Sequence, residues 1–111
     1  MRGEPTMVEV GLFGGRGRVL VWDLLEGRQA GPFVAVLACA LEPGGSVGAH
    51  RQEQFPEIVV GLAGVGRARV DGVRQELGPG QVVWLPLGSV LELENLSSEQ
   101  PLSYLILKAR A

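Results

Sequence analysis

The chain has 111 residues, of which 46% are hydrophobic and 20% charged, and its formal net charge is −2. This composition excludes a disordered chain and predicts one domain, spanning residues 1–111, around a single core. The ten basic residues are scattered and only 5% of residues are aromatic, so we expect neither nucleic acid nor a membrane as a partner. The longest apolar run, residues 33–41, is too short to span a bilayer, and no hydrophobic signal segment follows the N-terminus, which predicts a cytoplasmic protein. The excess of arginine over lysine is typical of a GC-rich genome and compatible with a thermophilic host.

Glycine and proline punctuate the chain at short intervals, and the segments between them have the composition of strands. Asp71-Gly72 is a strong hairpin signal, and no window keeps apolar residues at helical spacing over three turns. The pattern therefore predicts an all-β fold, an antiparallel sandwich or barrel with little or no helix. The expected strands are residues 8–13, 18–24, 33–41, 57–62, 67–71, 73–77, 81–85, 89–95 and 102–109.

Two kinds of strand can be distinguished by their alternation. Residues 91–94 read Leu-Glu-Leu-Glu, which predicts leucines facing the core and glutamates facing water, and Arg67 and Arg69 share one face in the same way. Residues 33–41, 58–63 and 104–107 are apolar on both faces, so something is expected to cover their outer side. We predict a homodimer; the alternative is that the N-terminal strands fold over that face.

The only histidine of the chain, His50, is followed by an amide at Gln52 and a carboxylate at Glu57. Two-residue spacing in a strand places His50 and Gln52 on one face, where Glu57 from the neighbouring strand is able to join them. Such a cluster has the donor types of a metal site or of an acid–base pair, although it is poor in ligands.

These residues belong to two motifs that resemble those of the cupin superfamily. Residues 44–64 match the first cupin motif at Gly44, His50, Glu57 and Gly64, with Gln52 in place of the second histidine. Residues 80–95 match the second motif at Gly80, Pro86, Gly88 and Asn95, with Leu91 in place of its histidine. The resemblance implies a double-stranded β-helix, a jelly-roll barrel. It says little about activity, because this fold hosts isomerases, epimerases, dioxygenases, and binding and storage proteins.

In the family, the positions of His50, Gln52, Glu57 and Leu91 hold a divalent metal, and leucine cannot ligate. The resemblance thus leaves two alternatives: one Mn, Fe, Ni or Zn ion held by His50, Gln52 and Glu57, or no metal, with His50 and Glu57 as an acid–base pair. The leading hypothesis is a protein that binds a small molecule at these residues, with Leu91 and Leu93 as an apolar wall. The other hypotheses are a metal-dependent isomerase or dioxygenase and a non-catalytic sensing or assembly module.

Overall fold

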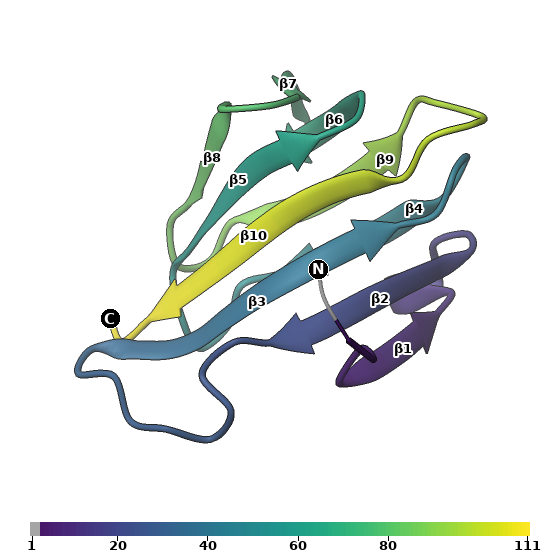
Figure 1. Ribbon diagram of the computed structural model, residues 1–111. Helices are drawn as coiled ribbons and strands as arrows, with labels where there is room; N and C mark the ends of the chain where they lie inside the picture. Colours follow the sequence, from purple (N-terminus) through teal and green to yellow (C-terminus); the bar gives the residue numbers. More distant parts are fainter. Residues whose placement is uncertain (1–2) are drawn as a thin grey trace.

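The computed structural model describes residues 3–111, which form two antiparallel sheets packed against each other as a small jelly-roll barrel (Figure 1). The larger sheet has the strand order β1-β2-β3-β10-β5-β8 and the smaller one β4-β9-β6-β7. The all-β, antiparallel architecture predicted from the sequence is confirmed. The elements are β1 (Met7–Val10), the 3-10 turn η1 (Leu12–Gly14), β2 (Arg18–Asp23), β3 (Phe33–Leu41), β4 (Ser46–Arg51), β5 (Glu57–Ala63), β6 (Gly66–Val70), β7 (Val73–Leu77), β8 (Val82–Leu85), β9 (Val90–Asn95) and β10 (Leu102–Ala109).

The expected strands agree with the observed ones except near the N-terminus and at β4. The predicted strand 8–13 is wrong beyond Val10, because Gly11 (φ 62°) and Phe13 (φ 53°) adopt left-handed backbone conformations that turn the chain into η1. The strand β4 was not among the strands expected from turn and composition signals, because its Ser-Val-Gly-Ala segment lacks regular apolar alternation. At the β6–β7 hairpin, Asp71 and Gly72 both take positive φ, as a tight two-residue turn requires.

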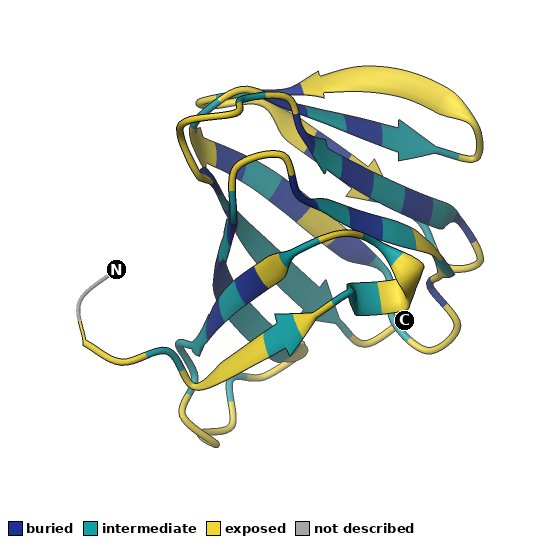
Figure 2. Cartoon of the chain, turned by 90° about the vertical axis from the view of Figure 1, so that its right-hand side faces the viewer, coloured by how far each residue is buried: buried dark blue, intermediate teal, exposed yellow. Residues whose placement is uncertain are grey.

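The core lies between the two sheets and is built mainly by alternation along the strands, although Ala38 and Cys39 of β3 are buried next to each other (Figure 2). On β9, Leu91 and Leu93 are buried whereas Glu92 and Glu94 are only partly covered, as the sequence predicted. The buried apolar side chains form one cluster: Val19, Val21, Cys39, Leu41, Val47, Val59, Ala68, Leu77, Val83, Leu85, Leu91, Leu93, Leu102 and Tyr104.

Asn95, the last position of the second motif, is buried and holds three loops together. Its amide Nδ2 donates to the carbonyl oxygens of Leu41 (3.1 Å), Glu42 (3.1 Å) and Gln100 (2.9 Å). Its Oδ1 accepts from the backbone N–H of Ser97 at 2.9 Å. Every partner is a main-chain group, and the Glu42 oxygen also accepts from the backbone N–H of Gly45, so Asn95 has a structural role in fixing these segments.

The outer faces of the two sheets differ in chemistry. The larger sheet presents apolar side chains at alternate positions, including Ile58 (40% exposed) and its cross-strand partner Trp84 (65% exposed). β1 and β2 extend this sheet at its edge beside β3 and do not lie across the face. Within residues 3–111, no helix has the length and apolar character needed to cross a membrane.

Candidate functional site

The barrel encloses a cavity of about 270 Å³ that both sheets line. Most of its wall is apolar, and Leu91 and Leu93 contribute to it as the sequence predicted. Its polar side chains are few. They include Cys39, His50, Tyr104 and Lys108, each of which is the only residue of its type in the chain. A second hollow, of about 630 Å³, forms the mouth above it and shares His50, Phe13 and Lys108 with the cavity. A concave apolar space with a few convergent polar groups is typical of a small-molecule site.

A β-bulge directs His50 into this cavity. Val47 pairs with Leu93 and His50 with Leu91, so two residues of β4, Gly48 and Ala49, lie opposite Glu92 alone. The extra residue changes the parity of the strand, and Val47 and His50 therefore both face inward although they are three positions apart. Sequence spacing alone does not reveal this shift.

The 3-10 turn η1 packs against the bulge and brings Phe13 onto His50. The two rings are stacked, with centroids 3.9 Å apart and planes inclined by 11°. This approach requires glycine: a Cβ on Gly48 would lie 1.9 Å from the Phe13 carbonyl oxygen, and one on Gly15 would lie 2.1 Å from that of Ser46. Phe13 itself holds a left-handed conformation (φ 53°, ψ 34°), which is unfavourable for a bulky residue. The turn is thus held in a strained shape that covers one side of the site.

The surroundings of His50 favour the neutral form of its imidazole. Its Nδ1 lies 3.0 Å from the carbonyl oxygen of Gly48, an acceptor, so Nδ1 carries the proton and Nε2 keeps its lone pair. Burial lowers the pKa of His50; the bond to Gly48 opposes this effect, and the charge of Lys108 adds to it. A neutral histidine with a free Nε2 is a competent proton acceptor.

Glu57 faces His50 across the cavity and is almost fully buried, at 3% exposure. Burial raises its pKa, and Lys108, whose Nζ lies 3.8 Å from Oε1, partly offsets this effect. The expectation that Glu57 comes from the strand beside His50 is wrong. β4 and β5 belong to opposite sheets, because residues 52–56 carry the chain from one to the other. In the described chain no ion pair or hydrogen bond joins the two side chains.

Cys39 and Tyr104 are cross-strand partners on the floor of the cavity. Burial raises the pKa of the Cys39 thiol to about 12 and that of the Tyr104 hydroxyl well above its usual range. Both side chains are therefore neutral at physiological pH, and a thiol that stays protonated is not a nucleophile.

Gln52 shares the mouth with His50 but does not line the cavity that His50 and Glu57 share. It follows the end of β4, is 6% exposed, and lines the mouth, whereas the cavity below is lined by His50 and Glu57 without it. Its backbone is fixed by bonds to Ser89 and Gly88, but its side-chain Nε2 has no hydrogen-bond partner among residues 3–111.

This donor set does not fit a divalent metal. Leu91, paired with His50, provides no ligand, and Gln52 lies in the mouth. The Lys108 ammonium already places a positive charge beside the Glu57 carboxylate, where a metal ion would be repelled. Among residues 3–111, no group of three His, Cys, Asp or Glu side chains is arranged to hold a metal ion.

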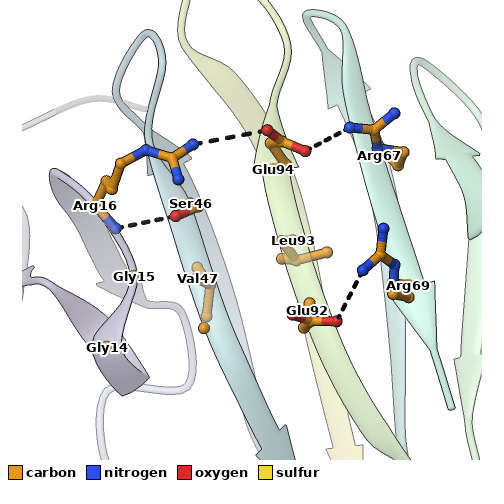
Figure 3. Close-up of a pocket in the computed structure, with 11 residues that line it drawn as sticks. Gly14, Gly15, Arg16, Ser46, Val47, Arg67, Arg69, Glu92, Leu93 and Glu94 are labelled. Atoms are coloured by element: carbon orange, nitrogen blue, oxygen red, sulfur yellow. Dashed lines mark hydrogen bonds and ion pairs between the residues drawn. The ribbon is translucent and has the colours of Figure 1, made fainter. Parts of the chain in front are cut away.

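A third hollow lies on the outer face of the smaller sheet (Figure 3). Its three arginines and two glutamates form ion pairs: Arg67 contacts Glu94 at 2.7 Å, Arg16 contacts Glu94 at 3.6 Å and Arg69 contacts Glu92 at 3.8 Å. The hydrogen bond from Arg67 lowers the pKa of Glu94. Arg67–Glu94 and Arg69–Glu92 are cross-strand pairs on a solvated face, and Arg16 joins them from the segment before β2. Such pairs stabilise strand pairing and are not typical of a ligand site.

Comparison with known proteins decides the family. The cupin domain matches residues 38–108, which include both motifs, the cavity-lining part of β10 and His50, Glu57 and Lys108. The chain belongs to the cupin family. The resemblance drawn from the two motifs is thus confirmed. No curated protein matches the chain significantly.

Solved cupin structures share the fold over nearly the whole chain. A predicted oxalate decarboxylase from Thermotoga maritima superposes with a TM-score of 0.86 at 24% identity, covering 97% of this chain and 94% of that one. A cupin 2 conserved barrel domain protein from Salinispora arenicola gives a TM-score of 0.69 at 25% identity, covering 96% and 87%. A sugar phosphate isomerase of the cupin superfamily from Silicibacter pomeroyi gives 0.69 at 22%, covering 84% and 60%. At such identities the likeness concerns the barrel and does not transfer an activity.

Two residues of the site were not anticipated from the sequence. Lys108 was detectable in principle, since it is the one lysine among ten basic residues and shares a strand face with Tyr104 and Ile106. Phe13 carried a weaker signal, the glycines on either side of it, which indicate a turn.

Proposed function

We propose that this cupin binds a small organic molecule inside its barrel, in contact with His50 and Glu57. The observation that carries the proposal is the partly open cavity of about 270 Å³ with a predominantly apolar wall and a few polar side chains that line it. This volume is close to the lower end of ligand sites, about 300 Å³, so the ligand is small. The apolar wall at Leu91 and Leu93 favours a ligand with a hydrophobic part.

A thermal-shift screen of small organic acids, amides, alcohols and sugars tests this proposal. A ligand that occupies the cavity raises the melting temperature of the wild type by mass action. The same compound is expected to give no shift with His50→Ala. Arg74→Ala, on the exposed strand β7, serves as the matched control and is expected to retain the shift. A screen without hits, or hits that survive His50→Ala and a bulky substitution at Leu93, would contradict binding in the cavity.

Proton-transfer catalysis, as in an isomerase or epimerase, is a second candidate supported by the opposite pKa shifts of two facing groups. His50 is held neutral with Nε2 free, and the pKa of the Glu57 carboxyl is raised so that it retains its proton more readily. A base and an acid on opposite sides of one cavity match the requirements of moving a proton from one carbon of a ligand to another.

Solvent deuterium separates this candidate from simple binding. If His50 removes a proton from a bound ligand, a hit from the screen incubated in D₂O is expected to gain deuterium at carbon in the presence of the wild type. The exchange is expected to be lost in His50→Gln and slowed in Glu57→Gln. If the mass of the ligand stays unchanged with the wild type as well as with both variants, catalysis by proton transfer is refuted, and simple binding is the function that remains.

We also propose that the apolar outer face of the larger sheet forms a homodimer. Ile58, Leu62, Val82 and Trp84 are 40–65% exposed on adjacent strands, and burying them is favourable. A second copy is the simplest partner, because an uncharged apolar face is complementary to itself across a two-fold axis. The N-terminal strands, which were the alternative cover, lie within the sheet.

A further inference from the structure

Among the lysine and arginine side chains of residues 3–111, Lys108 is the one that lines the interior of the barrel. It follows Tyr104 and Ile106 on the inward face of β10 and lines both the cavity and the mouth. The other nine basic residues are arginines, and none of the eight that the structure describes lines the cavity. The chain thus places its single lysine at the junction between a polar opening and an apolar space.

The ammonium of Lys108 has N–H donors that are not used in hydrogen bonds within residues 3–111. Its only charged contact is Glu57 Oε1 at 3.8 Å, which is too long for a strong hydrogen bond, and within residues 3–111 no hydrogen bond is formed by Nζ. The Lys108 side chain is 36% exposed whereas that of Glu57 is 2% exposed, so the ammonium is accessible from the mouth on the side away from the carboxylate. An ammonium has three N–H donors and no acceptor.

A second unpaired polar group lines the same mouth. Gln52 is only 6% exposed, and its side-chain Nε2 has no hydrogen-bond partner in the described chain. A buried donor without an acceptor is rare and calls for an oxygen from outside the chain. Arg51 stands at the rim, where it donates to the carbonyl oxygen of Gly88. Apart from this bonded guanidinium, the donors that line the mouth include those of Lys108 and Gln52, and the Glu53 carboxylate lines it as well.

We propose that the ligand is a small organic monocarboxylate, oriented with its carboxylate in the mouth and its apolar body in the cavity. This inference rests on the proposed function and names the ligand class. Lys108 and Gln52 supply N–H donors to the carboxylate oxygens, since a carboxylate is an acceptor only. The single lysine of the site supplies one positive charge, which matches a ligand with one carboxylate. The apolar wall below receives the remainder of the molecule.

Benzoate and benzamide provide a matched pair of probes with the same ring and shape. We would titrate each into the ¹⁵N-labelled full chain and follow the amide resonances of the cavity wall and the imidazole resonances of His50. Benzoate is expected to bind at least about tenfold more tightly than benzamide. Lys108→Met, which retains the apolar stem, is expected to abolish this preference, whereas Lys108→Arg retains it.

Arg51→Met is the control for general electrostatic attraction. It removes a charge of the same sign from the rim, and the benzoate-to-benzamide ratio is expected to stay within about twofold of the wild type, because an exposed charge contributes little. An equal loss of preference in Arg51→Met and Lys108→Met would overturn Lys108 as the anchor.

The outcome also separates this inference from the proposed function. Equal affinity of the wild type for the two probes would refute the carboxylate class while supporting a cavity that binds small molecules. Absence of binding by both would refute the class as well, and the thermal-shift screen then decides the proposed function independently. If Lys108→Met does not fold, the ratio of benzoate to benzamide affinity, measured with the wild type and with Lys108→Arg, still tests the carboxylate class.

Discussion

Substituting Gly48 by alanine tests how η1 is held against β4. The added Cβ would lie 1.9 Å from the carbonyl oxygen of Phe13 and 2.7 Å from its carbon, both backbone atoms that cannot rotate away. An ordinary contact needs about 3.4 Å, so the turn must retreat by roughly 1.5 Å, which separates the Phe13 and His50 rings. Loss of the stacking and the forced repacking together predict a destabilisation of about 2–4 kcal/mol.

Urea denaturation followed by tryptophan fluorescence measures this effect, and the His50 proton resonances report the loss of the ring current from Phe13. Gly78→Ala is the matched control. Its φ is not in the left-handed region, and the nearest atom to an added Cβ is Gln81 Oε1, at the end of a flexible side chain, at 3.2 Å. If Gly48→Ala lowers the free energy of unfolding no more than Gly78→Ala and leaves the His50 resonances unchanged, the account of the turn is wrong.

Four further predictions concern stability, pH and assembly. Asn95→Ala is expected to cost about 2–4 kcal/mol in urea denaturation, because it removes four hydrogen bonds to main-chain groups; an effect below about 1 kcal/mol would contradict its role. Because the pKa of Glu57 is raised, its stabilising contribution is complete below pH 4.5 and is lost as pH rises through that raised pKa; Glu57→Gln is expected to abolish this decline, and parallel pH profiles would refute it. The pKa of His50 is lowered, so the wild type loses stability as pH falls below 6.5, whereas His50→Phe is expected not to show this loss in the same denaturation series. Trp84→Arg is expected to convert a dimer to a monomer in sedimentation velocity, and a monomeric wild type at micromolar concentration would exclude the dimer.

The fold was predictable because local patterns and the motif spacing agree. Alternation at Leu91–Leu93, the hairpin at Asp71-Gly72 and the turn residues of both motifs all specify backbone geometry, which sequence encodes locally. The failures occur where tertiary contacts override local preference. Phe13 belongs to a segment that reads as strand, yet close packing on Gly48 holds it in a left-handed turn.

The site was predictable only in part, for reasons of register and topology. His50 and Glu57 do line one cavity, as expected, but they approach it from opposite sheets. The bulge at Gly48 and Ala49 turns His50 toward the cavity, and β4 ends at Arg51 before Gln52, which lines only the mouth; neither feature is visible in the spacing of the two residues. Lys108 lies outside both motifs, and only the pairing of β10 with β5 brings it beside Glu57. Their roles in binding or catalysis stay predictions.

The single histidine offers the most direct measurement of the central claim, that the barrel interior is a ligand site. Because His50 is the only histidine of the chain, its imidazole gives one pair of resonances, which reports on the cavity and on the mouth above it. During titration with a hit from the screen, these resonances are expected to shift and saturate in the wild type and to remain fixed in Leu93→Phe, in which the cavity is partly filled. Saturable binding with unmoved His50 resonances would place the ligand elsewhere and contradict the account.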